Sequence, residues 1–197
     1  MSARLPRAAV LLLAFTVSLA TSACTTIGIA GGYRGYAEAM LASLPQGVKL
    51  RPDLESVLAA ELNAYRKAEG RAPLAASGDA VVAARAQALE MFKGDFVGHE
   101  SASGYRFSQR ADAFLGETAS VGENTARDRL PGPVDATKAR RLFRQWVDSR
   151  GHRRNMLSPD YEEVSTGVIQ AGNHLYAVQI LWKRRATQDG MAAFRSW

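Results

Sequence analysis

The sequence contains one cysteine, Cys24, among its 197 residues. One thiol cannot form a disulfide within the chain, so packing alone has to stabilise the fold, even in an oxidising compartment. Aromatic residues make up only 8% of the chain, but hydrophobic residues make up 47%, which is ordinary for a globular protein with a buried core. The length predicts one domain with additional segments.

Long hydrophobic runs are also absent beyond the N-terminus, and a bilayer span takes about 20 apolar residues. The N-terminus carries the basic segment MSARLPR and then the apolar run AAVLLLAFTVSLA, a pattern typical of a secretory signal peptide. The small residues TSA before Cys24 resemble a bacterial lipobox, although Thr21 stands where leucine is more common. The resemblance implies a lipoprotein signal peptide over residues 1–23 and lipidation of Cys24. The alternative is an ordinary signal peptide with an incidental cysteine.

Charge of neither sign is concentrated. The formal net charge of +6 falls to +4 when Arg4 and Arg7 leave with the signal peptide. Such a mildly basic chain lacks the clustered basic stripe of a nucleic-acid-binding protein, so no nucleic-acid partner is predicted. Residues 24–52 are rich in Gly, Ala and Ser and predict a flexible tether with one short helix at Tyr36–Leu44. Residues 186–197 form a C-terminal tail.

Residues 53–185 carry the periodic patterns of a folded domain. Helical spacing predicts four helices: from Asp53 as N-cap to Gly70, from Ser77 as cap to Gly94, over Tyr105–Leu115, and from Asp135 as cap to Gly151. The segment ETASVGENTA fits a strand or a loop. Two β-rich runs around Gly172-Asn173 then predict a β-hairpin. Helices first and antiparallel strands last indicate a single-domain α+β fold.

Three short stretches contain polar residues that a core does not need. His99 follows Gly98 in GHESASG, Glu123 follows Gly122 in VGENTA, and His152 follows Gly151 in SRGHRRNML. Each position is predicted to lie in a loop or at the end of an element, where functional residues concentrate. Each also fits a cap or a surface residue when taken alone. The chain has neither the H-E-x-x-H spacing of a zinc protease nor a G-x-S-x-G nucleophile elbow.

The order of these stretches is more informative than any one of them. With LNAYRKAEGRAPL, RADAFLG, LFRQWVDSRGHRRNML and YAVQILW, they resemble the bacterial branch of the CAP superfamily over residues 53–185. This superfamily comprises cysteine-rich secretory proteins, insect venom antigens and plant pathogenesis-related proteins. The resemblance implies a three-layer α-β-α sandwich with a central antiparallel sheet. It also implies a cleft lined by two histidines and acidic residues, matched here by His99, Glu123 and His152.

The resemblance leaves the use of that cleft open. In many relatives a second glutamate stands at the position of Ser149, which weakens the case for an enzyme. His99 and His152, with Glu123, could hold Zn²⁺ or another divalent ion, or the three could form a polar network that fixes loops. Structural support is expected from Asn124, Ser149, Arg153 and Asn155.

We therefore expect an exported protein, anchored by lipid at Cys24 in a bacterial cell envelope. The favoured function is a non-catalytic module that binds a small ligand, a lipid or a divalent metal in the cleft. A metal-dependent hydrolase or peptidase is the first alternative, and a structural or interaction domain at the cell surface is the second.

Overall fold

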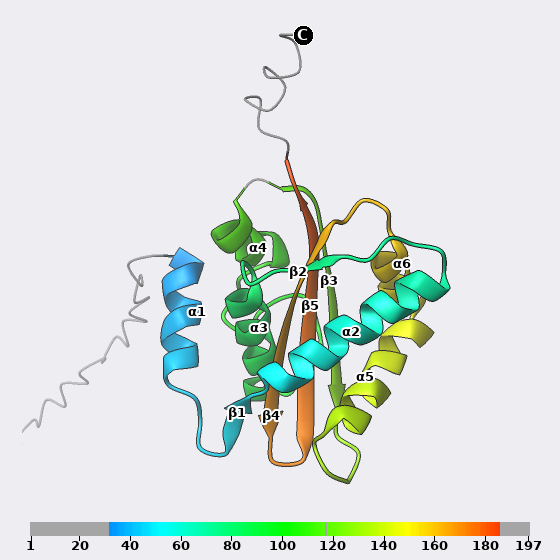
Figure 1. The fold of residues 1–197 in the computed structure, drawn as a ribbon. Coiled ribbons are helices and arrows are strands. Elements are labelled where there is room, and N and C mark those ends of the chain that lie inside the picture. Colours follow the sequence, from blue (N-terminus) through cyan, green and yellow to red (C-terminus); the bar gives the residue numbers. More distant parts are fainter. Residues whose placement is uncertain (1–31, 117, 186–197) are drawn as a thin grey trace, which may run out of the picture.

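The computed structural model describes residues 32–116 and 118–185 (Figure 1). The predictions for the signal peptide, for Cys24, for residues 24–31 and for the tail at 186–197 lie outside the described residues. Within the described part of the chain, no helix is long and apolar enough to cross a membrane.

One five-stranded sheet forms the centre of the domain. Its strands are β1 (Val48–Leu50), β2 (Ala75–Ala76), β3 (Thr118–Asp128), β4 (Glu163–Ala171) and β5 (His174–Arg184). The order is β1-β4-β5-β3, and all of these pairs are antiparallel, whereas the short β2 pairs in parallel with the start of β4. The predicted hairpin is confirmed as β4 and β5. Gly172 supplies the positive φ of 58° in its tight turn.

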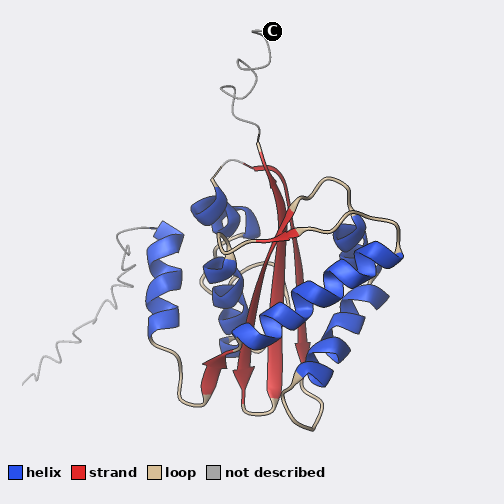
Figure 2. Ribbon diagram, viewed as in Figure 1, coloured by secondary structure: helices blue, strands red, loops and turns tan. Residues whose placement is uncertain are grey.

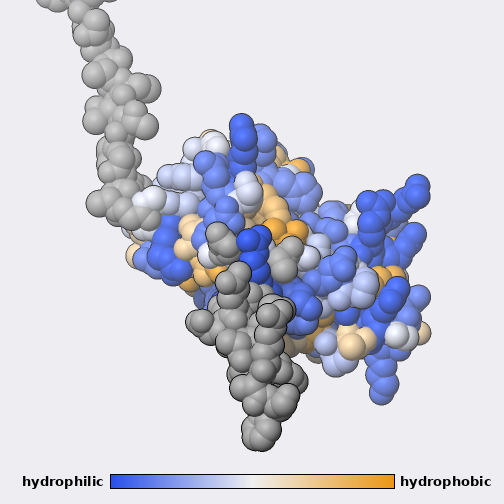
Figure 3. Space-filling view, turned by 90° about the horizontal axis from the view of Figure 1, so that it is seen from above, coloured by the Kyte–Doolittle hydropathy of each residue, from blue (hydrophilic) through white to orange (hydrophobic). Residues whose placement is uncertain are grey.

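Helices cover both faces of this sheet (Figure 2). One layer consists of α1 (Gly32–Ala42), α3 (Val81–Lys93) and α4 (Phe107–Leu115). The other consists of α2 (Pro52–Ala68), α5 (Ala136–Asp148) and α6 (Arg150–Leu157). The predicted three-layer sandwich is therefore confirmed. Viewed from above, the described surface is largely hydrophilic with a smaller hydrophobic area (Figure 3), as expected when the apolar helix faces are turned to the sheet.

Strand β5 shows how the two cores are divided. Tyr176, Val178 and Ile180 face the core under α3, while the alternate residues Leu175 and Ala177 face the core under α5. This period of two is what a central strand buried on both faces requires. The core therefore extends on both sides of the sheet, and loops at the sheet edges remain available to carry functional side chains.

Part of the predicted tether belongs to the packed domain. In α1, Tyr33 is 4% exposed and Ala37 is fully buried against α3 and α4, and β1 pairs with β4. The small residues that suggested a flexible segment instead let α1 pack closely. Residues 32–52 thus differ from the expected tether.

Two predicted helix caps are wrong. Helix α2 begins one residue before Asp53, whose carboxylate accepts hydrogen bonds from Arg51 instead of capping the helix. Helix α3 begins at Val81, and the Ser77 hydroxyl accepts a hydrogen bond from the Asp79 backbone in the preceding turn. The cap at Asp135 is confirmed, because its side chain accepts from the Lys138 backbone at 3.1 Å.

Candidate functional site

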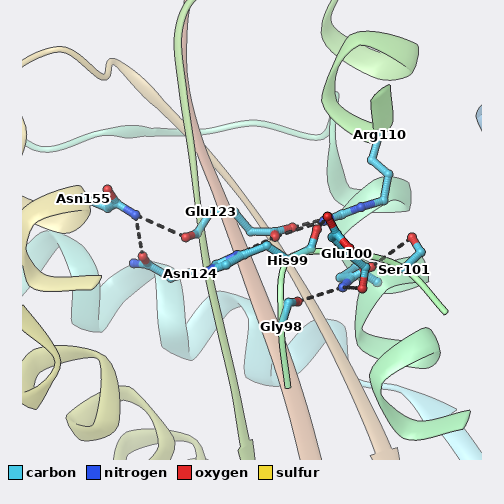
Figure 4. Close-up of polar contacts among 9 residues, drawn as sticks. Gly98, His99, Glu100, Ser101, Arg110, Glu123, Asn124 and Asn155 are labelled. Carbon is cyan, nitrogen blue, oxygen red and sulfur yellow. Dashed lines mark hydrogen bonds and ion pairs between the residues drawn. The ribbon is translucent and has the colours of Figure 1, made fainter. Parts of the chain in front are cut away.

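Glu123 lies in the middle of the edge strand β3, and its side chain is held by a buried arginine from α4. The Glu123 side chain is 1% exposed and that of Arg110 is 0% exposed. Arg110 Nη2 donates to Glu123 Oε1 at 3.0 Å, and Nη1 lies 2.9 Å from Oε2 (Figure 4). Of these two contacts, only Nη2–Oε1 is a hydrogen bond, and Nη1 and Oε2 form an ion pair. Two buried charges this close compensate each other's loss of hydration.

His99 lies in the loop between α3 and α4, and several bonds fix this loop. Arg110 Nη2 also donates to the His99 carbonyl at 2.8 Å, and the fully buried Gln87 of α3 donates to the Gly98 carbonyl at 2.8 Å. Glu90 of α3 accepts a hydrogen bond from the Ser103 backbone at 3.1 Å. The His99 ring is therefore presented from a loop whose backbone is tied to two helices.

The His99 ring contacts Glu123 directly. Nδ1 lies 3.0 Å from Glu123 Oε1, while the side chain remains 55% exposed. The hydrogen bond to Glu123 raises the pKa of His99 above its ordinary value of 6.5, against the opposing effect of burial. Near neutral pH, His99 therefore carries more positive charge than an ordinary histidine.

His152 lies in a helix, so the prediction that Gly151 ends the preceding helix and leaves His152 in a turn is wrong. Helix α5 ends at Asp148, the break falls at Ser149, and α6 begins at Arg150. Ser149 adopts an extended backbone (φ −80°, ψ 119°), which redirects the chain before α6. Gly151 and His152 therefore belong to the first turn of α6.

His152 differs from His99 in its electrostatic state. Burial lowers the pKa of His152 below 6.5, and the nearby His99 lowers it further. Its Nδ1 is buried and has no hydrogen-bond partner among the described residues. The side chain lines a pocket of about 380 Å³ together with residues from the loop after α3, β3 and α5: Val97, Thr125, Ala126, Arg127, Gln145, Trp146 and Ser149.

A pair of asparagines links α6 to β3 beside these residues. Asn155 Nδ2 donates to the Glu123 carbonyl at 3.2 Å and to Asn124 Oδ1 at 3.0 Å. Asn124 is fully buried and its amide lies 3.4 Å from the His152 carbonyl. Arg153 donates to the Val147 carbonyl at 3.0 Å, across the break between α5 and α6. These contacts tie α6 to β3 and to the end of α5, whereas the Ser149 side chain makes no capping bond to α6 among the described residues. A supporting role for these four residues stays a prediction.

The structure thus joins two of the three predicted cleft residues directly and places the third beside them. No hydrogen bond connects the His152 ring to His99 or Glu123 within the described chain. Among the described residues, no group of three or more His, Cys, Asp or Glu side chains is arranged to hold a metal ion. That the three share one ligand stays a prediction.

Arg110 is the functional residue that sequence reasoning missed. It stands in RADAFLG, which contributed to the family resemblance without any role for its arginine. In the structure it is fully buried, and it contacts both Glu123 and the loop that carries His99. Its position in the first turn of α4 gave no local sign of burial, because the carboxylate that compensates it lies on another element.

An antiparallel sheet between two helix layers, with histidines and a glutamate at one edge, is the architecture expected of a CAP domain. Residues 59–181, well over half of the chain, match the Cysteine-rich secretory protein family (CAP), and the chain belongs to this family. The resemblance inferred from the sequence is therefore confirmed.

Bacterial proteins are among its relatives. The chain is 27% identical to "Uncharacterized protein YkwD" of Bacillus subtilis over 111 residues, which are 56% of this chain and 40% of YkwD. An outer surface protein from Borrelia burgdorferi has a similar fold, with a TM-score of 0.59, 16% identity, and coverage of 68% of this chain and 96% of that one. An extracellular SCP-domain protein from Bacillus anthracis gives a TM-score of 0.56 and 19% identity, covering 68% of this chain and 41% of that one. The two structural likenesses show the fold alone, and the chain spans less than half of YkwD.

Proposed function

We propose that this domain is a non-catalytic binding module of the cell envelope, and that its ligand occupies the cleft between His99 and the pocket at His152. The state of Glu123 carries this proposal. Its Oε1 accepts from both His99 and Arg110, and its Oε2 is paired with Arg110. A carboxylate engaged in this way is poorly suited to take a proton from water, which a hydrolase would require of its general base.

The pocket beside this network has features of a ligand site. It combines a buried, unpartnered His152 Nδ1 with the apolar side chain of Val97, which is 44% exposed. Small-ligand sites are typically apolar concavities with a few fixed polar groups, and unpaired buried polar atoms are rare in folded proteins. A ligand that hydrogen-bonds to His152 would satisfy that atom.

Divalent metal binding fits the present arrangement less well. A zinc site needs its ligands free to coordinate, and catalytic sites use three protein ligands. Glu123 is paired with Arg110, whose buried positive charge would also repel a cation. Calorimetric titration of Zn²⁺ can test this part, with His152→Ala compared with His174→Ala, a histidine at the start of β5. Tight zinc binding that is lost only in His152→Ala would show that the metal is a ligand of the cleft.

The binding function is tested by separating binding from turnover. A panel of small organic fragments should shift the NMR resonances of His152 in the wild-type domain, and His152→Ala should weaken those interactions while His174→Ala leaves them unchanged. A peptide and ester library incubated with the domain should stay intact. Turnover that disappears in Glu123→Ala would overturn the non-catalytic assignment.

A hydrolase is the second candidate, and one observation favours it. The pKa of His99 is raised and that of His152 is lowered, which is the separation that an acid and a base acting together require. Ser149 lines the same pocket as His152. Turnover that is sensitive to chelator would point to a metal-dependent reaction, whereas chelator-resistant turnover lost in Ser149→Ala would point to a serine nucleophile.

The cellular location is also part of the proposal. The signal-peptide pattern and Cys24 support export and lipid anchoring, and the names of two structural relatives describe an outer surface protein and an extracellular protein. Mass spectrometry of the protein extracted from membranes should find an acylated Cys24. An unmodified Cys24 thiol would refute lipid anchoring.

A further inference from the structure

One edge of the sheet is formed by β3, whose one strand neighbour in the described part of the chain is β5. Backbone groups of an antiparallel strand point alternately toward and away from its neighbour. Two side-chain amides show which backbone groups of β3 point away from β5. Asn155 Nδ2 donates to the Glu123 carbonyl at 3.2 Å, and Gln145 Nε2 donates to the Arg127 carbonyl at 3.2 Å. The N–H and C=O of Thr125, midway between them, therefore also point away from β5.

Thr125 differs from its two neighbours on this edge. No side chain or backbone group of the described residues hydrogen-bonds to its outward N–H or C=O, although the residue is only 3% exposed. It lines the pocket of about 380 Å³ that also contains His152. Buried backbone groups are nearly always paired with protein or with water in native proteins, so a ligand that displaces water from this position has to offer both an acceptor and a donor.

The walls of the pocket come from opposite layers of the sandwich. Val97 belongs to the loop after α3, whereas Gln145 and His152 belong to α5 and α6. The Glu123 side chain points to α4, and the Ala126 side chain packs in the core with Trp146 of α5. The pocket therefore lies along the edge of the sheet, between the layers, where an additional strand would run.

From this geometry we propose that the pocket binds a short extended peptide, which adds to the edge of β3 by pairing with the N–H and C=O of Thr125. The inference rests on the proposed binding function and specifies its ligand class. Strand addition of this kind takes its affinity from main-chain hydrogen bonds and its specificity from alternate side chains. A lipid chain would leave both Thr125 groups unpaired, and a metal ion could accept only the carbonyl oxygen as a ligand, leaving the N–H unpaired.

The bound segment is short, and its side chains have defined surroundings. The side-chain amides of Asn155 and Gln145 already bind the carbonyls of Glu123 and Arg127 on either side of Thr125. These two carbonyls are four residues apart, a distance of about 13 Å at about 3.3 Å per residue. About three peptide residues fit between them. Side chains of an added strand would alternate between Val97 on one wall and His152 on the other.

The test uses blocked tri-alanine (acetyl-Ala-Ala-Ala-amide) as the probe and NMR titration of the soluble domain as the readout. The Thr125 amide resonance should shift on binding. Thr125→Pro removes the backbone donor, and proline is tolerated on an edge strand where the N–H faces away from the sheet. We expect about tenfold weaker binding, or about 1.4 kcal/mol, for the loss of one hydrogen bond. Val121→Pro, on the same edge outside the pocket, should bind like the wild type.

A change in the probe keeps the test independent of the folding of Thr125→Pro. Replacing the central amide of the peptide by an ester removes its donor to the Thr125 carbonyl, and binding to the wild type should weaken by a similar factor. Equal binding of the amide and the ester, or a peptide that leaves the Thr125 resonance unchanged, would overturn the inference. If organic fragments still shift His152 in that case, the proposed binding function survives without the peptide. If neither class of compound binds, both are wrong.

Discussion

Removing either Arg110 or Glu123 alone should destabilise this domain strongly, because each side chain neutralises the buried charge of the other. Both side chains are essentially inaccessible to water, and their charged atoms lie 2.9–3.0 Å apart. Replacing either one leaves an uncompensated buried charge, which typically costs about 3–5 kcal/mol. We expect this loss for Arg110→Met and for Glu123→Leu, measured as the free energy of unfolding in urea.

The double variant measures how much of each single loss comes from leaving the partner's charge unpaired. A buried ion pair replaced by apolar side chains of similar volume is often neutral or even stabilising. Arg110→Met combined with Glu123→Leu should therefore be more stable than either single variant, apart from about 1 kcal/mol for the lost bond to the His99 carbonyl. The cycle should show strong non-additivity.

An exposed ion pair provides the matched control. Arg140 and Glu61 lie 2.7 Å apart, but their side chains are 51% and 32% exposed. Arg140→Met should cost at most about 1 kcal/mol. Burial would not explain the cost if Arg110→Met were no more destabilising than Arg140→Met, or if the double variant cost the sum of its single variants.

Two further predictions concern packing and titration. Glu123→Gln should lower the pKa of His99 toward 6.5, because the hydrogen bond to the carboxylate is the main cause of its elevation. NMR titration of the ring protons measures this pKa. An unchanged pKa would show that another group raises it. Gly167→Ala should be clearly more destabilising than Gly122→Ala in thermal unfolding. A Cβ at Gly167 would overlap backbone atoms of α3, whereas at Gly122 it would overlap the end of the Tyr161 side chain, which can shift as a whole. Equal losses would show that the side chain of Tyr161 is as immobile as the helix backbone.

The layers of this fold could be predicted because they depend on local patterns. The β4–β5 hairpin follows from β-rich runs around one glycine turn, and the face of α5 follows from apolar residues at helical spacing. The caps were less predictable, since Asp53 and Ser77 each had a competing partner two residues away. Helix α1 was expected only as a short helix at Tyr36–Leu44 within a tether, because its alanines and glycines gave little amphipathic signal. In the structure it spans Gly32–Ala42, and Ala37 is fully buried beside α3.

The site was predictable only as a set of residue names. Glu123 and His99 were found through a family resemblance, and their contact follows from the loop bonds made by α3 and α4. Arg110 could not be found, because its burial depends on a carboxylate 13 positions later on another element. The break at Ser149 was assigned to Gly151, since glycine is the commoner helix terminator. No sequence pattern indicates the outward backbone groups of Thr125, because they depend on which strand lies at the edge.

The opposite electrostatic states of the two histidines lead to a pH dependence of ligand binding. Glu123 raises the pKa of His99 while Arg110 and burial oppose this, and burial together with His99 lowers that of His152. A ligand that needs a charged His99 is lost as pH rises through the raised pKa, and one that needs a neutral His152 is lost as pH falls through the lowered pKa. Affinity for a ligand that contacts both rings should therefore be greatest in a window that includes pH 6.5. Glu123→Gln should lower the pH above which affinity is lost, because it lowers the pKa of His99. The pH below which affinity is lost should stay the same, because it is set by His152. Affinity that is constant across the window would show that neither ring contacts the ligand.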